Sequence, residues 1–291
     1  MRKQLAAMLE ERTEQLVGRQ RSEEEKIIRK HDSLAKRKAE IVRVMATGHV
    51  TGTEREGIHE HVFYDIHLKY LIKQCDKMYM EEGIEHRKAS FYKGGVFQDA
   101  EVPVIYPNTG PIAGAAKAER AERSEERQRY TYNRMEAVRY AERWWNSYNP
   151  AYIKFDVDCT NYISQCMHAG GAPMRGHPNR SKGWWYRNKN WSYSWSVANA
   201  LKTYLQHSTS GLRANEVTDP LELKLGDVIC YDFQGDGRFD HNTIVTGKDA
   251  AGMPLVNAHT YNSRMRYWAY EDSTAYTPNI KYKMFTILDD A

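Results

Sequence analysis

One cysteine occupies a position at which its thiol would be a nucleophile. Four residues of the segment that starts at Asp158 recur at helical spacing: Cys159, Tyr162, Ile163 and Cys166. This spacing predicts a helix over 155–170, with Cys159 in its first turn and Asp158 or Thr160 as a capping residue. A thiol there faces the positive end of the helix dipole, which lowers its pKa and favours the thiolate. The alternative is that Cys159 is a small buried core residue, as free cysteines usually are.

Histidines on predicted strands supply the base that a cysteine nucleophile needs. His241 begins a predicted strand over 241–247. The next predicted strand, 255–260, carries Asn257 and His259 on one face, because side chains alternate along a strand. A polar group on a neighbouring strand can fix the tautomer of a catalytic histidine and stabilise its cation. The pattern therefore indicates a Cys-His-polar arrangement.

The loop before His241 shares part of the pattern of a calcium-binding loop. Five of its residues match that pattern: Asp232, Gln234, Asp236, Gly237 and Asp240. However, Thr243 stands where a bidentate glutamate belongs, and Arg238 adds a positive charge. We therefore expect a tight turn that delivers His241, with no metal and no other cofactor.

The elements that must position these residues form two groups. Helices are predicted over 130–149, 155–170 and 196–206, and strands over 227–233, 241–247, 255–260 and 281–288. Helices followed by an antiparallel meander predict an α+β fold. Between them lies an aromatic segment that includes Trp184 and Trp185. Its rings suit the wall of a substrate cleft, and packing in the core is the equal alternative.

Four separated runs of this chain resemble one known family in the same order. They are DCTNYISQCMHAGG from Asp158, GDVICYDF from Gly226, GDGRFDHNTIVTG from Gly235 and NAHT from Asn257. The resemblance is to the "putative amidase domain" family of Gram-positive bacteria, within the papain-like, NlpC-type cysteine peptidases and amidases. It covers roughly 130–288. It implies a papain-like domain in which N-terminal helices pack on an antiparallel β-meander.

The resemblance also implies roles for single residues. Cys159 would be the nucleophile and His241 the general base, with His259, or alternatively Asn257, as the third polar residue. The backbone N–H of Cys159 would be the first oxyanion donor. Two tyrosines that precede it, Tyr148 and Tyr152, are candidates for the second donor.

These roles imply thiol-dependent hydrolysis of an amide or peptide bond, and the resemblance suggests a peptide of the cell-wall type. An acyl transferase using the same Cys159 and His241 pair is one alternative. A noncatalytic binding or scaffold protein with a degenerate papain-like fold is the other. A peptide or amide is therefore the partner that the sequence predicts.

The first part of the chain has a different character. Residues 1–38 form a charged helical segment with a thin apolar seam, which packs on its own domain or binds a partner that the sequence does not identify. Residues 39–101 predict a small antiparallel unit of three or four strands. Residues 102–129 predict a linker and a charged helix, and 130–291 the catalytic domain. Three histidines of the small unit share a strand face: His59, His61 and His67. We interpret them as surface or cross-strand residues rather than metal ligands.

Composition excludes several classes of protein. The 291 residues include 42 basic and 38 acidic side chains, a net charge of +4 that is too small to indicate nucleic-acid binding. No apolar run approaches the ~20 residues of a membrane-spanning helix. The four cysteines form no CxxC pair, so we expect free thiols. The first residues lack the apolar core of a secretion signal, and we therefore expect a cytoplasmic location.

Overall fold

The structure, a computed structural model, describes residues 2–103 and 129–290. It divides the chain into two compact units. Unit 1 comprises Met1–Ile105 with the short segments Asp249–Ala251 and Ala269–Thr274, and unit 2 comprises the rest of the chain. The predicted linker and charged helix over 102–129 lie almost wholly outside the described residues.

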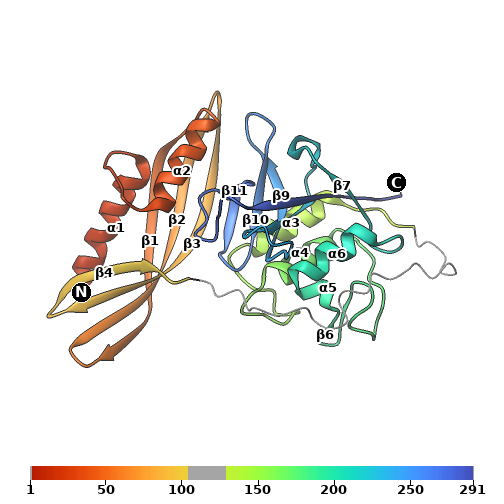
Figure 1. Cartoon of the computed structure of the whole chain (residues 1–291), viewed down its shortest axis with the longest axis horizontal. Helices are drawn as coiled ribbons and strands as arrows, with labels where there is room; N and C mark the ends of the chain where they lie inside the picture. The colour runs from red at the N-terminus through yellow and green to blue at the C-terminus, as the bar shows by residue number, and fades with distance from the viewer. Residues whose placement is uncertain (1, 104–128, 291) are drawn as a thin grey trace. The chain divides into compact units, whose positions relative to one another are not determined.

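Unit 1 consists of two helices and a four-stranded antiparallel sheet (Figure 1). The helices are α1 (Arg2–Val17) and α2 (Glu25–Lys36). The strands are β1 (Ala39–Glu56), β2 (His59–Gln74), β3 (Lys77–Tyr92) and β4 (Gly95–Glu101). They pair in sequence order, as expected for strands joined by short turns.

Strand alternation builds the core of unit 1. Alternate residues of β2 are buried on one face: Tyr64, Ile66, Leu68, Tyr70 and Ile72. They pack with apolar residues of the two helices: Leu5, Leu16, Ile27 and Leu34. The apolar seam of the charged N-terminal segment therefore covers the sheet of its own unit, because this contact removes both apolar faces from water.

Charged residues of β3 lie on the same buried face. Glu85 pairs with Ile66 across the strands, and its carboxylate is 2.8 Å from Arg12, 2.9 Å from Lys26 and 3.3 Å from Arg87. Burial alone would raise the pKa of Glu85, but these three cations outweigh it and lower the pKa to about 2. The helices of unit 1 are thus held on the sheet by buried ion pairs as well as by apolar packing.

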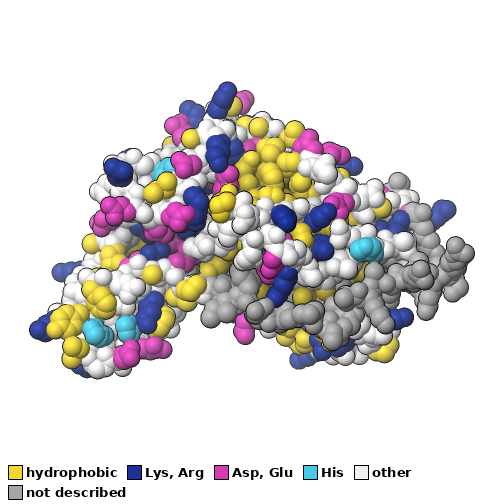
Figure 2. All heavy atoms as spheres, viewed as in Figure 1, with side chains coloured by type: hydrophobic (Ala, Val, Ile, Leu, Met, Phe, Trp, Pro, Cys, Tyr) yellow, Lys and Arg dark blue, Asp and Glu magenta, His cyan; other side chains and the backbone are white. Residues whose placement is uncertain are grey.

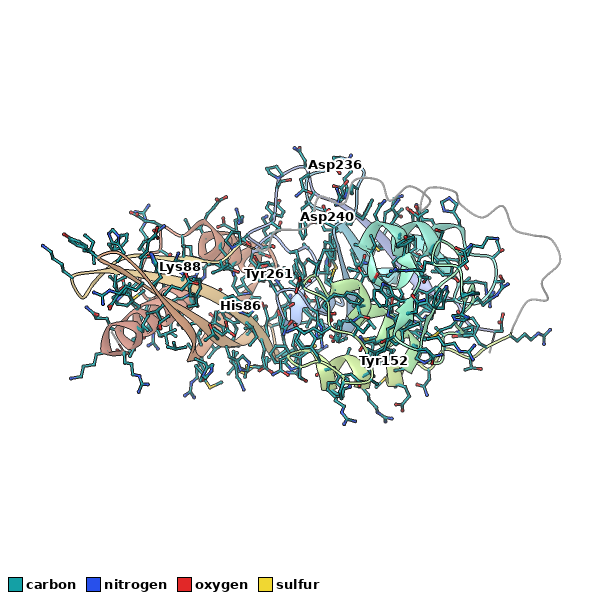
Figure 3. All side chains as sticks on the ribbon, turned by 90° about the horizontal axis from the view of Figure 1, so that it is seen from below. His86, Lys88, Tyr152, Asp236, Asp240 and Tyr261 are labelled. Carbon is teal, nitrogen blue, oxygen red and sulfur yellow. The ribbon has the colours of Figure 1, made fainter. Side chains whose placement is uncertain are left out.

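The histidines of unit 1 have separate partners. His59 packs against Tyr92 and Phe97, with ring centroids 5.6 and 5.5 Å away. His61 Nδ1 lies 2.9 Å from the hydroxyl of Ser90, and His67 Nε2 lies 2.9 Å from the carboxylate of Glu82. His86, labelled in Figure 3, contacts Asp65 at 2.6 Å. Over residues 2–103 and 129–290, no group of three or more metal-ligating side chains is found.

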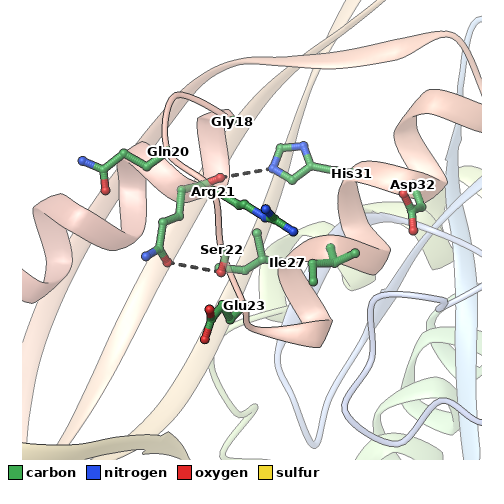
Figure 4. Close-up of a pocket in the computed structure, with 10 residues that line it drawn as sticks. Gly18, Gln20, Arg21, Ser22, Glu23, Ile27, His31 and Asp32 are labelled. Carbon is green, nitrogen blue, oxygen red and sulfur yellow. Dashed lines mark hydrogen bonds between the residues drawn. The ribbon is translucent and has the colours of Figure 1, made fainter.

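A hollow of about 540 Å³ lies beside the connection between α1 and α2 (Figure 4). Two hydrogen bonds cross it: His31 Nε2 contacts the carbonyl oxygen of Gln15 at 3.2 Å, and the Ser22 hydroxyl lies 3.4 Å from Gln15 Oε1. None of the site residues expected from the sequence lines this hollow.

Over its described residues, unit 2 combines four helices with a six-stranded antiparallel sheet. The helices are α3 (Arg134–Trp144), α4 (Cys159–Ala169), α5 (Tyr193–Ser196) and α6 (Ala198–His207), with a 3-10 turn at Pro220–Glu222. The sheet contains β7 (Ala214–Val217), β8 (Val228–Asp232), β9 (His241–Lys248), β10 (Pro254–Ala258), β11 (Ser263–Tyr267) and β12 (Lys281–Ile287). A separate small ladder joins β5 (Tyr186–Arg187) to β6 (Asn190–Trp191).

The strands of this sheet pair in the order β11-β10-β9-β8-β12-β7. One face of the sheet packs against α4, which is buried along its length from Cys159 to Met167. Strand residues in this core include Val228, Cys230 and Ile244. Unit 2 is therefore an α+β domain with a central buried helix, and α4 begins at the residue expected to be the nucleophile.

No helix among the described residues has the length and apolar character needed to cross a membrane. In the space-filling view, basic and acidic side chains are interspersed over the visible face (Figure 2). All four cysteines are free thiols, as the sequence predicts; Cys75 is exposed and the other three are buried.

Candidate active site

Cys159 is the first residue of α4 and only 1% of it is exposed. Its sulfur lies 3.7 Å from the hydroxyl of Thr160 and 4.0 Å from the carbonyl oxygen of Asp240, which it contacts as a donor. The backbone N–H of Cys159 donates to the hydroxyl of Thr260 at 3.2 Å. Cys159 therefore contacts the residue that precedes β9 through its sulfur, and the turn that follows β10 through its backbone N–H.

Burial controls the charge of this thiol. Desolvation raises the pKa of Cys159 above its ordinary value, although hydrogen bonds from the Asn242 N–H, Thr160 and Thr260 act in the opposite direction. The expectation of a resting thiolate, based on the helix dipole, is thus not met. A dipole effect is small compared with the cost of placing a charged sulfur in a water-free position.

Asp158 precedes the helix but does not cap it through its side chain. One carboxylate oxygen accepts from the Phe155 N–H at 3.0 Å and from Asn161 Nδ2 at 2.9 Å. The other lies 2.8 Å from Nδ1 of His259. Asp158 therefore joins the turn before α4 to the end of β10, instead of satisfying the first N–H groups of the helix.

The loop between β8 and β9 is held by Asp232. Its two carboxylate oxygens accept from the N–H groups of Gly235 at 2.7 Å and Gly237 at 2.8 Å. Gly235 has a φ of +74°, and a Cβ there would lie 2.3 Å from the carbonyl oxygen of Asn279. These contacts make the loop the tight turn that the sequence predicts. Figure 3 labels Asp236 in this loop.

His241 starts β9 and only 2% of it is exposed. Its ring packs against Tyr231 and Phe233, with centroids 5.7 and 6.1 Å away. Desolvation, assisted by the positive charge of Arg266, lowers the pKa of His241 to about 3. The adjacent carboxyl of Asp240 has a pKa raised to about 6, also mainly by burial. The ring of His241 is therefore neutral at neutral pH.

Strand register places the His241 ring and α4 on different faces of the sheet. Tyr231 pairs with His241, whereas Cys230 pairs with Asn242. Cys230 belongs to the core that contains α4, so Asn242 shares its face and His241 points to the other. The structure thus brings the sulfur to the backbone beside His241, while the imidazole ring extends from the opposite side of the strand.

The two candidates for the third residue are engaged elsewhere. His259 has Nδ1 at 2.8 Å from Asp158 and Nε2 at 2.7 Å from the carbonyl oxygen of Trp144. Asn257 accepts from Thr246 and donates to Glu142. Neither side chain orients His241, which corrects the role expected from the sequence. The reason is register: Asn257 pairs with Ile244, so it and His259 lie on the α4 face.

The two tyrosines considered as oxyanion donors lie in different parts of unit 2. Tyr148 lies edge-on to the His259 ring at 4.9 Å, and the side chain of Asn262 hydrogen-bonds its hydroxyl. Tyr152, by contrast, stacks on Trp195 at 5.9 Å and packs against Tyr186 at 5.0 Å. The sulfur of Cys159 contacts the carbonyl oxygen of Asp240, and Figure 3 shows Tyr152 well away from Asp240. Only Tyr148 therefore lies close to the residues that surround Cys159.

The tryptophans expected in a substrate cleft are core residues. Trp184 is fully buried and its indole N–H donates to Ser164 at 3.0 Å. Trp185 is also buried, and its N–H donates to the carbonyl oxygen of Asn179 at 3.1 Å. The alternative of core packing is therefore the one that the structure supports, since both polar atoms are satisfied inside unit 2.

Three further polar residues belong to the site: Asn242 and Thr260, which the sequence reasoning does not name, and Thr160, which it names only as a capping residue. Asn242 Nδ2 donates to the hydroxyl of Thr160 at 3.0 Å, which ties β9 to the first turn of α4. Thr260 accepts from the N–H of Cys159. Each of them directly follows a residue selected for catalysis: Thr160 after Cys159, Asn242 after His241 and Thr260 after His259. Their position directly after the selected residues is the feature of the sequence that could have identified them.

Comparisons with known proteins identify the family of this chain. A Bacillus subtilis (strain 168) protein named "Uncharacterized protein YhbB" is 51% identical over 269 residues, covering 90% of this chain and 86% of that protein. A second protein of that strain, "Uncharacterized protein YjcM", is 33% identical over 141 residues, covering 45% of this chain and 31% of that protein. No solved structure matches. The family model described as "Putative amidase domain" matches residues 131–285, which include every residue of the site described above. The chain therefore belongs to this amidase domain family.

Proposed function

We propose that the protein hydrolyses an amide or peptide bond through an acyl-enzyme on Cys159, with His241 as the general base. The observation that carries the proposal is the position of the thiol. Cys159 opens α4, and its sulfur lies 4.0 Å from the carbonyl oxygen of Asp240, the residue before His241. The family of the chain is described as an amidase domain, and a cysteine with a nearby histidine can cleave amides without a cofactor. We further propose a papain-like arrangement for unit 2, because its helices precede an antiparallel meander.

Of the two histidines near the site, His241 is the better base. Its pKa of about 3 leaves the ring neutral, with a lone pair that can take the thiol proton. His259 directs one nitrogen at the carboxylate of Asp158 and the other at the carbonyl oxygen of Trp144. Both ring nitrogens of His259 are therefore engaged with these two partners, and neither is directed at Cys159.

The proposed reaction has two halves. First, the thiol gives its proton to the His241 ring, the sulfur bonds to the carbonyl carbon, and the carbonyl oxygen becomes an oxyanion at the Cys159 N–H. Collapse of this intermediate breaks the C–N bond, and the ring proton goes to the leaving amine. Water, deprotonated by the ring, then hydrolyses the thioester and restores the thiol.

Strand register adds one requirement to this mechanism. The His241 ring extends from the face opposite α4, so it must turn around the start of β9 to reach the sulfur. His241 is the first residue of the strand, and the rotation would separate its ring from those of Tyr231 and Phe233. We therefore place this rotation together with substrate entry, before the chemical step.

The burial of Cys159 favours a second candidate function, a noncatalytic binding protein that keeps the fold of the family. A thiol that is 1% exposed with a raised pKa is unreactive as it stands. The amidase proposal requires the site to open, whereas the binding proposal does not. Measured turnover separates the two.

The experiment uses the full chain with a panel of N-acyl amides and short peptides, including peptides of the cell-wall type. Products are followed by mass spectrometry, and an added amine such as hydroxylamine detects acyl transfer. Cys159→Ala should abolish turnover, while Cys166→Ala, a matched change on the same buried helix, should retain it. Equal activity of Cys159→Ala and the wild type would refute the proposal.

A further inference from the structure

The hydroxyl of Thr260 occupies the position that a substrate carbonyl oxygen needs. It accepts the hydrogen bond of the Cys159 backbone N–H at 3.2 Å. In the proposed reaction this N–H is the donor that stabilises the oxyanion. Since a hydroxyl oxygen and a carbonyl oxygen are both acceptors, they compete for the same donor. While Thr260 stays in place, an amide cannot be positioned for attack by the sulfur.

The backbone of Thr260 is strained. Its φ is +83°, in a region that β-branched residues rarely adopt because Cβ collides with the backbone. Such strain costs of order 1–3 kcal/mol and persists only where neighbouring contacts impose it. A turn of the Thr260 backbone toward negative φ would release the strain and withdraw the hydroxyl from Cys159.

The residues on either side of Thr260 differ in how completely their side chains are hydrogen-bonded. His259 is fixed by Asp158 and by the Trp144 carbonyl oxygen. Asn262 contacts the Tyr148 hydroxyl, yet its Oδ1 has no hydrogen-bond partner within the described part of the chain, although only 9% of the residue is exposed. The turn over 260–262, in which Figure 3 labels Tyr261, is therefore anchored at its start and incompletely satisfied at its end.

We propose that Thr260 is a gate for Cys159: its hydroxyl fills the oxyanion position in the resting protein, and the 260–262 turn must move outward before an amide carbonyl binds. Thr260 is half-exposed whereas Cys159 is buried, so the gate lies between the thiol and solvent. This inference deepens the proposed amidase function and rests on it for the identity of the ligand, a carbonyl oxygen. Thr260 is a positioning residue here, since it acts through the N–H of Cys159.

The test measures how fast iodoacetamide alkylates Cys159 in the intact protein, by peptide mass spectrometry. Iodoacetamide is a small amide, and its reaction needs access to the sulfur but no turnover. Thr260→Gly removes the hydroxyl that accepts from the Cys159 N–H together with the rest of the side chain, so the turn loses a contact that holds it closed. It also relieves the strain of the closed turn, so faster alkylation would come from the lost side chain and not from released strain. We expect Cys159 to be alkylated about tenfold faster, the factor that corresponds to the loss of one hydrogen bond. Thr260→Ser, which keeps the hydroxyl, is the matched control and should stay near the wild-type rate.

Buried thiols elsewhere in unit 2 report whether a variant has lost its fold. Cys166 and Cys230 are both in the core, and their alkylation should remain slow in every variant. If Thr260→Gly also accelerates the alkylation of Cys166 and Cys230, the test of the gate passes to Thr260→Val. This variant keeps the size and branching of the side chain and removes the hydroxyl. Unchanged alkylation of Cys159 in the decisive variant would overturn the gate.

The outcomes for the gate and for the amidase function are distinct. If the protein hydrolyses no amide but Thr260→Gly selectively exposes Cys159, the gate is supported and the amidase proposal is refuted. If the protein hydrolyses amides through Cys159 but Thr260→Gly does not change its alkylation, the amidase proposal is supported and the gate is refuted.

Discussion

Protonation of His241 should be a major source of acid instability in unit 2. The pKa of this ring is lowered from 6.5 to about 3, first by burial and then by Arg266. A base whose pKa falls on folding stabilises the native state above its unfolded pKa, and this stabilisation is lost as the pH falls below that value. The loss therefore begins near pH 6.5 and continues until the folded ring itself protonates near pH 3.

The size of the effect follows from the two pKa values. At pH 4.5 the unfolded ring lies 2 pH units below its pKa of 6.5, while the folded ring is still neutral. Each unit corresponds to about 1.36 kcal/mol, so His241 alone should remove about 3 kcal/mol of stability between pH 7.5 and pH 4.5. Full burial of the ring means that solvent screening does not reduce this figure.

Urea denaturation of the wild type and of His241→Gln at pH 7.5, 6 and 4.5 measures this contribution. All seven tryptophans belong to unit 2, so their fluorescence follows the unfolding of that unit. The substituted glutamine does not titrate, and the variant should lose about 3 kcal/mol less than the wild type over this range. Asp240, whose pKa is raised to about 6, is present in both proteins, and its effect cancels in the comparison. Equal losses in the two proteins would refute the argument that burial keeps the ring neutral.

Four further outcomes follow from particular contacts. Iodoacetamide should alkylate the exposed Cys75 first, then Cys159, and Cys166 and Cys230 last; a Cys159 faster than Cys75 would contradict its raised pKa. In Gly235→Ala the new Cβ would lie 2.3 Å from the Asn279 carbonyl oxygen, whereas in Gly237→Ala, also at positive φ, it would meet no atom within 4 Å. Gly235→Ala should therefore lower the Tm of unit 2 by several degrees more than Gly237→Ala. Equal shifts in Tm would exclude the clash. Glu85→Ala removes the carboxylate that Arg12, Lys26 and Arg87 share, although each of these cations keeps a second one, from Glu24, Glu101 and Asp99 respectively. It should therefore destabilise unit 1 by less than the about 3–5 kcal/mol of a buried pair broken outright, measured by hydrogen exchange of β2 and β3, and by more than Glu25→Ala, which removes an exposed pair and should cost under about 1 kcal/mol. Asp158→Asn should slow turnover and leave His259 without its anionic partner, and unchanged kinetics would show that this pair does not position the thiol.

Much of the fold is predictable from the spacing of apolar residues. This spacing is regular in helices and strands that bury one face or all of their side chains. The helix at Cys159 has apolar and small residues at helical spacing and is buried in the structure. The strand beginning at His241 and its partner near 254 are hydrophobic runs separated by turn residues. The short strands β7 and β11 were missed, since ANEV and SRMRY have little strand character of their own and form by pairing with neighbours.

The site was less predictable than the fold, because it depends on register. Alternation correctly puts Asn257 and His259 on one face, but which face depends on how β10 aligns with β9. A shift between Leu255 and Val256 sets that alignment, and a change of one residue reverses every side chain. Sequence patterns do not reveal such a bulge. The contact between His259 and Asp158, 101 residues away in sequence, was likewise beyond any local pattern.

The two pKa shifts at the site have one cause, and that cause would disappear when the site opens. The pKa of Cys159 lies above its ordinary 9.0 and that of His241 near 3, so the two differ by more than 6 and proton transfer at rest is unfavourable by over about 8 kcal/mol. With both groups hydrated, the ordinary values of 9.0 and 6.5 differ by 2.5, which corresponds to about 3 kcal/mol. Desolvation is the largest contribution to each shift, so admitting water or a polar substrate lowers the thiol pKa and raises the imidazole pKa together. The movement of Thr260 that frees the oxyanion donor would therefore also activate the nucleophile, and the closed site keeps the thiol protonated until a ligand arrives.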